Sequence, residues 1–536
     1  MTYLLAAAPF FPFLLALLCI LPQVRRHAMQ MLAFAPVPGL AAALLAPGGV
    51  LILPPAPFRI TLFLDTPGAI LLGTSSLLWI AAGAYASTYM RGDEKARGFA
   101  VWWLLTLAGS QGVFLVADLT SFYLAFALVS LAAYGLAAHE DNAAARQAGI
   151  LYLVLTLVSE ALLIMAFVML ASGAGGNPDI REVVAALPLS PWRDAIITLL
   201  VLGFGLKMGL VPLHVWMPLA HSVAPVPASA VLSGIVVKAG VIGLMRFLPF
   251  GDVLPGWGGL LVVSGLVTAY FGILVGLTQT HPKTVLAYST VSQMGVVAVV
   301  LGAGLTAGDE GTVVAAALYA ANHVLLKGAL FLGVGVVLTT PRDRLWPLAL
   351  LALTGFSLAG LPLTGGMLAK VAIKGPLGDG TAALLLTLSA AGTTLLMLRF
   401  LERLRAAATG EETGAPKGLL IPWAALAGTA LVAPYVLLPL ATGDAAWAVV
   451  SLADLWNTLW PVLLGLALAA ALRSHVGRLP AIPPGDVVVL AKRLGPTLTA
   501  SMKAADRMEG TLRRWPAAML LLVAITLLLA AVTSGR

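Results

Sequence analysis

Four lysines lie inside long apolar segments of this 536-residue chain, where a charged side chain is retained only with an interaction partner or a function. They are Lys207, Lys238, Lys327 and Lys370. A lysine at the centre of a bilayer costs about 2.5–3.5 kcal/mol on insertion scales. Structural salt bridges are one explanation for the four. A buried ammonium also exchanges its proton readily when a neighbouring acid or water chain changes state, and we therefore favour ion transfer.

Other charged residues lie nearer the ends of the apolar segments, where contact with the membrane surface is the simpler expectation. Lys374, Arg246 and Arg399 are long enough to reach the headgroups from such positions. Asp65 and Asp118 are expected to be solvated at the interface. None of these five residues is assigned to the ion path.

Two histidines and one glutamate accompany the four lysines. Histidine titrates near neutral pH, so His221 and His323 suit a proton relay, although a lone membrane histidine often only hydrogen-bonds a neighbouring helix. His323 and Lys327 are four residues apart, so they share one face of a helix. Glu160 is the only acidic residue well inside an apolar segment. We predict that it pairs with Lys207.

Helix-breaking residues interrupt the segments around these lysines. The predicted breaks are at Pro212, Pro218, Pro225, Pro227, Gly360 and Pro362. Broken helices at membrane depth leave backbone groups that water, side chains or ions must satisfy, so they mark cavities. A kink without function is the alternative for either break alone. Two similar breaks in successive halves of the chain predict two five-helix repeats, which are inverted because five is odd.

The composition places these residues in a membrane. Hydrophobic residues make up 60% of the chain and charged residues 10%, and the mean hydropathy is +0.98. Soluble proteins carry about 25% charged residues. Apolar runs near 20 residues recur, and each can cross about 30 Å of hydrocarbon as a helix. We predict an all-α integral membrane protein with about sixteen transmembrane helices, at residues 2–21, 28–46, 68–90, 99–116, 119–138, 147–171, 195–218, 222–248, 258–279, 285–304, 311–338, 346–372, 381–400, 419–440, 450–472 and 515–533.

These helices divide the chain into six parts. The parts are N-terminal helices at 1–98, a first repeat at 99–248, a second repeat at 258–403, additional helices at 419–472, a basic amphipathic segment at 473–514 and a C-terminal helix at 515–536. The basic segment lies either on anionic headgroups or along a neighbouring subunit as a brace. Lysine and arginine concentrate in alternate loops, which predicts that both termini lie on the periplasmic side of a bacterial inner membrane.

Several chemistries lack their usual groups in the sequence. Cys19 is the only cysteine, so disulfide frameworks and thiolate sites for zinc or iron–sulfur clusters are excluded. Phosphate-binding glycine loops and the HExxH motif are absent, and we predict no cofactor, no metal and no redox chemistry of the chain's own. The net charge of +8 lies largely in short loops, where membrane orientation explains it, so nucleic acid is not a predicted partner.

Sequence blocks around the buried residues carry a resemblance to a known family. The first block runs from Lys207 through PLHVWMP to His221, and the second contains Lys238-Ala-Gly. LAYSTVSQMG, the pair of His323 and Lys327, and GLPLTGGMLAK follow. In this order the blocks resemble the antiporter-like subunits shared by respiratory complex I, Mrp-type cation/proton antiporters and membrane-bound group 4 hydrogenases.

The resemblance covers about residues 65–400, and it implies a function. It implies proton transfer, or exchange of protons for Na⁺, along a lysine and histidine axis halfway across the membrane. Lys207 would accept the proton in the first repeat, Lys238 and Lys327 would bridge the repeats, and Lys370 would pass it onward. The implied partners are other membrane subunits, with peripheral redox or enzyme subunits in some relatives.

One position departs from the family. A glutamate is usual in the fifth span, but Ala127 holds that place here. Either Glu160 substitutes from the next helix, which we favour, or the first repeat has lost its coupling. The departure keeps a second function open, a membrane anchor or scaffold with impaired conduction. A third is energy coupling to an inorganic-carbon uptake complex, since relatives of this fold serve there.

Overall fold

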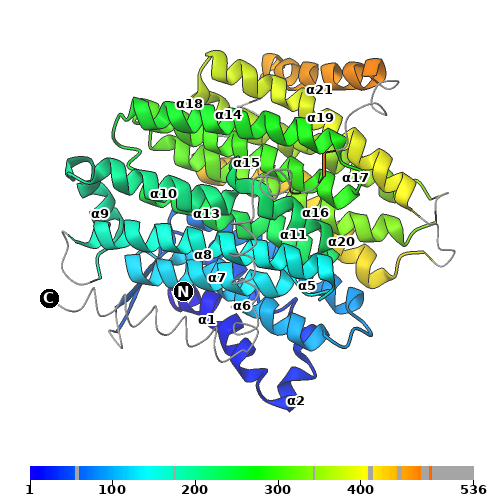
Figure 1. Ribbon diagram of the computed structural model, residues 1–536, viewed down its shortest axis with the longest axis horizontal. Helices are drawn as coiled ribbons and strands as arrows, with labels where there is room; N and C mark the ends of the chain where they lie inside the picture. The colour runs from blue at the N-terminus through cyan, green and yellow to red at the C-terminus, as the bar shows by residue number, and fades with distance from the viewer. Residues whose placement is uncertain are drawn as a thin grey trace, which may run out of the picture.

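The protein is a bundle of long helices that lie side by side (Figure 1). The structure is a computed structural model, and it describes residues 1–54, 59–172, 177–341, 344–408, 414–443, 450–472, 482–483 and 485. The N-terminal helices and the last described helix lie at opposite ends of the bundle.

The first part of the chain combines helices with one β-hairpin. Its elements are α1 (Tyr3–Leu18), α2 (Pro22–Arg25), α3 (Ala28–Met31), α4 (Val37–Leu45), β1 (Val50–Leu53), β2 (Ile60–Phe63), α5 (Thr66–Tyr89), α6 (Ala96–Leu115), α7 (Leu119–Ala137), α8 (Ala143–Ala171), α9 (Ile180–Ala186), the 3₁₀ turn η1 (Leu187–Leu189) and α10 (Arg193–Met208).

The remaining described chain is helical. Its elements are the 3₁₀ turn η2 (Leu213–Val215), α11 (Trp216–Val223), α12 (Val226–Val231), the π-helical turn η3 (Leu232–Val236), α13 (Val237–Phe247), α14 (Pro255–Thr278), α15 (Pro282–Ala307), α16 (Gly311–Leu338), α17 (Trp346–Ala359), α18 (Gly365–Leu377), α19 (Thr381–Ala407), α20 (Lys417–Thr442) and α21 (Leu452–Leu472).

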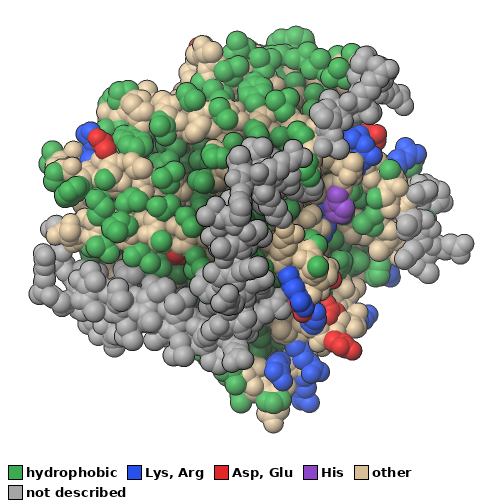
Figure 2. All heavy atoms as spheres, in the orientation of Figure 1, with side chains coloured by type: hydrophobic (Ala, Val, Ile, Leu, Met, Phe, Trp, Pro, Cys, Tyr) green, Lys and Arg blue, Asp and Glu red, His purple; other side chains and the backbone are tan. Residues whose placement is uncertain are grey.

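The length and composition of these helices suit a bilayer. Twelve helical segments of the described residues are long and apolar enough to cross a membrane, and α1 and α17 are apolar but shorter. Figure 2 shows that hydrophobic side chains cover most of the described surface on this face. Charged side chains gather mainly toward one edge. The chain is therefore an all-α, multi-pass membrane protein, as its composition predicts.

The structure differs from the predicted spans in the N-terminal part. The span predicted at 28–46 is wrong as a single helix, because turns at residues 32–36 separate α3 from α4. The sequence also does not predict the antiparallel hairpin, in which Val50 pairs with Phe63 and Leu53 with Ile60. The predicted helix at 515–533 and nearly all of the segment at 473–514 lie outside the described residues.

The helices that carry the central charged residues are the most enclosed. In α15 and in the segment from α12 to α13, every residue of the apolar window is buried within the protein, and in α16 94% are. The corresponding share is 22% in α21, at the edge of the bundle. Polar groups of the central helices are therefore shielded from lipid by surrounding helices.

Arg246 joins α13 to the ends of α5 and α6. Its guanidinium donates to the carbonyls of Val113, Phe114 and Val116 at 2.7–3.0 Å and forms an ion pair with Asp65 at 3.1 Å. The planar guanidinium suits this role because it offers several donors at once. The expectation that Arg246 extends to the headgroups is therefore wrong.

Asp118 likewise has a structural position. Its carboxylate is fully buried and accepts hydrogen bonds from the amides of Thr61 and Ser121 and from the Asn177 side chain, at 2.7–2.8 Å. These contacts connect the hairpin, the start of α7 and the segment before α9. The expected interfacial solvation of Asp118 is wrong, because backbone and amide donors replace water around it.

We expect Arg246→Met to destabilise the protein. The substitution leaves Asp65 and three carbonyls without their donor, and removing one partner of a buried ion pair costs about 3–5 kcal/mol. The melting temperature of the purified protein in detergent measures the effect. Arg146→Met, which removes an exposed ion pair with Asp141, is the matched control. Equal melting temperatures for the two variants would contradict the role assigned to Arg246.

Candidate functional site

The central group of the site is formed by Lys238, His323 and Lys327. The Lys238 Nζ atom lies 2.7 Å from the His323 Nδ1 atom, which joins α13 to α16. Lys327 lies one turn after His323 on α16, and its ammonium donates to the Leu286 carbonyl at 2.9 Å and to the Ser289 hydroxyl of α15. All three side chains are at most 1% exposed. Three neighbouring helices therefore hold two lysines and a histidine in the interior.

His221 lies near this group. It is on α11, it is fully buried, and its ring stacks against Phe331 with centroids 5.0 Å apart. The imidazole interacts electrostatically with Lys283 and Lys327. Neither ring nitrogen has a hydrogen-bond partner among the described residues. His221 therefore lies near Lys283 and Lys327, and its ring can form a hydrogen bond with water.

Lys207 lies in the last turn of α10. Its Nζ atom donates to the Tyr152 hydroxyl of α8 at 3.0 Å, and this hydroxyl donates to the Ser130 carbonyl of α7 at 2.7 Å. The lysine side chain is 2% exposed. The C-terminal end of a helix is electronegative, so the position stabilises an ammonium.

Glu160 lies on α8, two helical turns after Tyr152. Its carboxylate is 5% exposed and interacts electrostatically with Lys207, although no direct salt bridge between these described residues is formed. The side chains of Tyr123 and Ser130 lie close to the carboxylate, but neither of its oxygens has a partner at hydrogen-bonding geometry among the described residues. Tyr152 is the direct partner of Lys207 in the structure, and the predicted pairing of Glu160 with Lys207 stays a prediction.

Ala127 belongs to the same neighbourhood. It lies on α7 and is 2% exposed. The ring of Phe126, the preceding residue, is centred 6.0 Å from the Lys207 Nζ atom. Ala127 is therefore buried on α7 and directly follows, in sequence, the aromatic residue that lies near Lys207.

The first helix break separates α10 from α11. α10 ends at Met208, Gly209 adopts a φ of +81°, and Pro212 precedes η2. Because the helix stops here, carbonyls of its last turn need other donors. The Trp216 indole donates to one of them, that of Leu206, at 3.0 Å.

The other prolines of this region differ in their positions. Pro225 caps the start of α12, whereas Pro218 and Pro227 lie inside the first turns of α11 and α12. The amide of a first-turn residue has no partner within the helix, so a proline there interrupts nothing. The chain bends at Ala224, between these helices.

The second break separates α17 from α18 and positions Lys370. α17 ends at Ala359, Gly360 adopts a φ of +100°, and Pro362 lies in the link that follows. The Lys370 Nζ atom donates to the Ala359 carbonyl at 2.5 Å. A Cβ atom on Gly360 would lie 2.7 Å from the Cδ atom of Lys370, so the glycine also makes room for the lysine. Both breaks thus bring a lysine to the C-terminal end of a helix: Lys207 belongs to the last turn of α10, and Lys370 of α18 bonds the last residue of α17.

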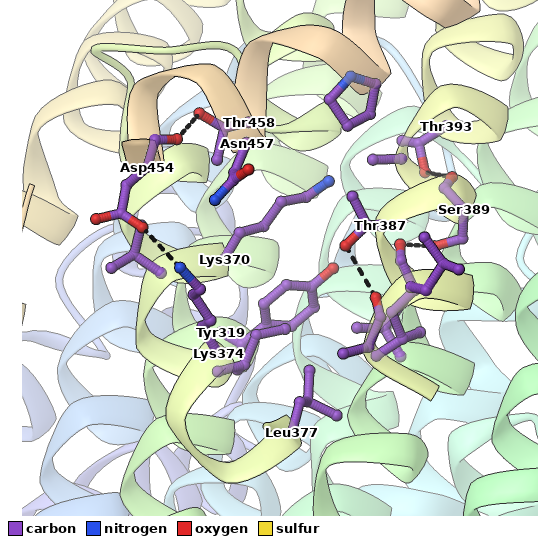
Figure 3. Close-up of a pocket in the computed structure, with 18 of the residues that line it drawn as sticks. Tyr319, Lys370, Lys374, Leu377, Thr387, Ser389, Thr393, Asp454, Asn457 and Thr458 are labelled. Carbon is purple, nitrogen blue, oxygen red and sulfur yellow. Dashed lines mark hydrogen bonds and ion pairs between the residues drawn. The ribbon is translucent and has the colours of Figure 1, made fainter. Parts of the chain in front are cut away.

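A cavity of about 320 Å³ lies beside Lys370, whose side chain extends into it (Figure 3). The Tyr319 hydroxyl of α16 donates to the Gln293 amide oxygen of α15 at 2.5 Å, and the Gln293 amide nitrogen donates to the Thr393 hydroxyl of α19 at 3.2 Å. Helices α18 and α21 complete the lining. The cavity is therefore polar enough to hold water next to the lysine.

The site residues named from the sequence thus form three groups, around Lys207, Lys238 and Lys370. The described residues include no group of three or more histidine, cysteine, aspartate or glutamate side chains placed to hold a metal. Tyr152, which binds the first lysine, is not among the residues predicted from the sequence. The spacing of the sequence could have indicated this tyrosine, because Tyr152, Thr156 and Glu160 recur every four residues and so share one face of α8.

Comparisons with known proteins show the family of the chain. The family model described as "NADH:quinone oxidoreductase/Mrp antiporter, TM" matches residues 116–397, more than half of the chain. Hydrogenase-4 component B of Escherichia coli K12 is 33% identical over 301 residues, which cover 53% of this chain and 44% of that protein. NADH-quinone oxidoreductase subunit N of Desulforudis audaxviator is 30% identical over 297 residues, which cover 53% of this chain and 57% of that protein. The chain spans about half the length of these curated relatives.

A solved structure shares the fold. It is the Mrp complex from Dietzia sp. DQ12-45-1b, in which one chain superposes with a TM-score of 0.76 at 24% identity. The superposition covers 99% of this chain and 62% of that chain. This likeness concerns the fold alone.

Proposed function

The chain belongs to the NADH:quinone oxidoreductase/Mrp antiporter transmembrane family, and we propose that it is an ion-translocating subunit that moves protons along its buried basic residues. The single observation that carries the proposal is the central group, where Lys238 and His323 are in hydrogen-bond contact within helices that are almost completely enclosed. The proposed proton-transfer residues are Lys207, Glu160, His221, Lys238, His323, Lys327 and Lys370.

The order of helices supports two inverted repeats. α6, α7, α8, the broken helix α10–α11 and the segment α12–α13 form a first set of five. α14, α15, α16, the broken helix α17–α18 and α19 form a second. The fourth member of each set is the broken one, and it carries Lys207 in the first set and Lys370 in the second. We therefore place one half-path in each repeat, at 99–248 and 258–403, with Lys238, His323 and Lys327 between them.

We further propose that the subunit acts in a larger membrane complex. The relatives named above are a hydrogenase component and a quinone oxidoreductase subunit, and the fold is that of a chain in an Mrp complex. Redox partners or an ion gradient would supply the energy, and the ion would be H⁺, alone or exchanged for Na⁺. The loop charges favour a bacterial inner membrane with both termini periplasmic.

One observation favours a second function, that of a membrane anchor. Ala127 supplies no carboxylate, and Glu160 forms no direct salt bridge with Lys207 among the described residues. A subunit that lost coupling in this way would keep the fold and hold other subunits. The intact series of buried lysines opposes this alternative.

The decisive test is proton transport by the native complex with Lys238→Arg. Arginine keeps the positive charge and can still bind His323, but it does not release its proton in proteins. An ion-transfer role predicts a loss of about a hundredfold, because a positioned proton donor contributes about that much or more. Proton uptake into vesicles measures the rate, and co-purification of the other subunits reports assembly.

Lys95→Arg, at an exposed residue paired with Asp141, is the matched control and should retain full transport. Full transport by an assembled Lys238→Arg complex would contradict proton transfer through Lys238. It would favour the structural or anchoring role instead.

A further inference from the structure

Helix α21 lies outside both proposed repeats, yet it forms one wall of the cavity beside Lys370. Asp454, Asn457, Thr458 and Pro461 recur at helical spacing and line the cavity. On other faces of the same helix, large apolar side chains such as Trp456 are exposed. α21 is thus an amphipathic helix that directs its polar face at the space around the lysine (Figure 3).

Two contacts hold α21 in this place. Near its middle, Gly465 packs so closely on α19 that a Cβ atom would lie 2.6 Å from the Thr394 Cβ atom. At its start, Asp454 forms an ion pair with Lys374 of α18 at 3.1 Å. Only 22% of the apolar window of α21 is buried, and its first turns are otherwise held by the partly buried Leu455 and the buried Thr458.

The ion pair lies at the edge of the cavity, one helical turn from Lys370. The Lys374 side chain is 51% exposed, whereas that of Asp454 is 13% exposed. Gly378 and Asp379, which follow α18, also line the cavity at this end. With a volume of about 320 Å³, the cavity has room for roughly ten water molecules at about 30 Å³ each.

We propose that α21 completes a water-filled access path between Lys370 and the membrane face on which α18 ends, and that Asp454 positions α21 over this path through its ion pair with Lys374. Breaking the ion pair would free the first turns of α21 and widen the path. The role of the path in transport rests on the proposed function, because it requires Lys370 to exchange protons. The geometry of the path does not require transport.

Asp454 also has a local role, which a test must separate from the ion pair. Its carboxylate accepts hydrogen bonds from the Ser451 hydroxyl at 2.6 Å and the Ser451 amide at 3.2 Å, and the Ser451 hydroxyl accepts from the Asp454 amide at 3.1 Å. These reciprocal bonds cap the start of α21. Ser451→Ala removes part of the cap and leaves the ion pair, so it is the matched control.

Thiol labelling in the intact complex tests the proposal. With the single native cysteine removed by Cys19→Ala, Ser389→Cys places a thiol on the cavity wall, and Ser75→Cys places one in the buried interior of α5. Both serines are nearly or fully buried and donate to the carbonyl three residues earlier. A membrane-impermeant, cationic methanethiosulfonate is applied to each face of vesicles without an ion gradient.

We expect slow labelling of Ser389→Cys from one face and no labelling of Ser75→Cys. Asp454→Asn should speed the labelling of Ser389→Cys about fivefold, the size of effect that a partly exposed ion pair can exert. The charge exchange Lys374→Asp with Asp454→Lys should restore the slow rate, whereas Ser451→Ala should not change it.

Three results would overturn the proposal. They are an unchanged labelling rate in Asp454→Asn, a fast rate that the charge exchange does not reverse, and an equal acceleration in Ser451→Ala. Labelling does not depend on proton transport. Failure of the proposed function would appear as a Lys238→Arg complex that still transports, while the labelling pattern stays as described.

Discussion

Replacing Glu160 with glutamine is expected to lower proton transport about a hundredfold. Glu160 is the only acidic residue well inside an apolar segment of the sequence. Its carboxylate interacts electrostatically with Lys207, without a salt bridge between the two side chains. Neither carboxylate oxygen has a partner at hydrogen-bonding geometry among the described residues, so its interaction with the lysine acts over a distance. Glutamine keeps the shape and removes the charge.

Vesicle uptake compares Glu160→Gln with Lys207→Ala, which should abolish transport outright. Lys95→Ala, at an exposed lysine, is the control and should retain full transport. If Glu160→Gln leaves transport intact while Lys207→Ala abolishes it, the pairing of the two residues is refuted. The first repeat would then work without a carboxylate beside its lysine.

A substitution at Ala127 tests in a second way whether Lys207 needs a carboxylate nearby. Ala127 is buried on α7 and directly follows Phe126, whose ring centre lies 6.0 Å from the Lys207 Nζ atom. A carboxylate restored there by Ala127→Glu should recover part of the transport that Glu160→Gln loses. Recovery would show that the lysine needs a nearby negative charge, from whichever helix supplies it.

The central group shows what spacing can and cannot predict. The four-residue separation of His323 and Lys327 predicts a shared helix face, and both lie on α16. Their contact with Lys238 could not be predicted, because it depends on how α13 packs against α16. The π-helical turn η3 immediately before Lys238 also shifts the direction of its side chain relative to a regular helix.

The helix breaks follow a similar rule. Pro212 and Gly360 both lie between helices. At Pro212 the missing amide interrupts no helix, and at Gly360 the chain adopts the left-handed φ that favours glycine. Pro218 and Pro227 lie in first turns, where a proline is harmless, and sequence alone does not distinguish the two situations. The β-hairpin could not be predicted, because a short apolar run such as VLIL, at 50–53, fits a strand or a buried helix equally well.

Charged residues near span ends were the least predictable. Arg246 and Asp118 have positions in sequence that suit the membrane surface, but distant carbonyls and amides surround them in the folded chain. Lys374 instead forms an ion pair with Asp454, which lies 80 residues later in the sequence. These partners come from other elements, so only the tertiary structure separates a surface charge from a structural ion pair.

Removing the lysine at the second break is expected to have the other large effect, with Lys370→Ala abolishing proton transport while the complex still assembles. Lys370 both binds the end of a broken helix and reaches a cavity. Alanine leaves the Ala359 carbonyl to water and keeps the cavity, so the path loses its titratable group but not its water. Lys417→Ala, at the exposed start of α20, is the control for vesicle uptake. If Lys370→Ala transports at the control rate, protons leave the central group by another route, and the second repeat does not carry the outward half-path.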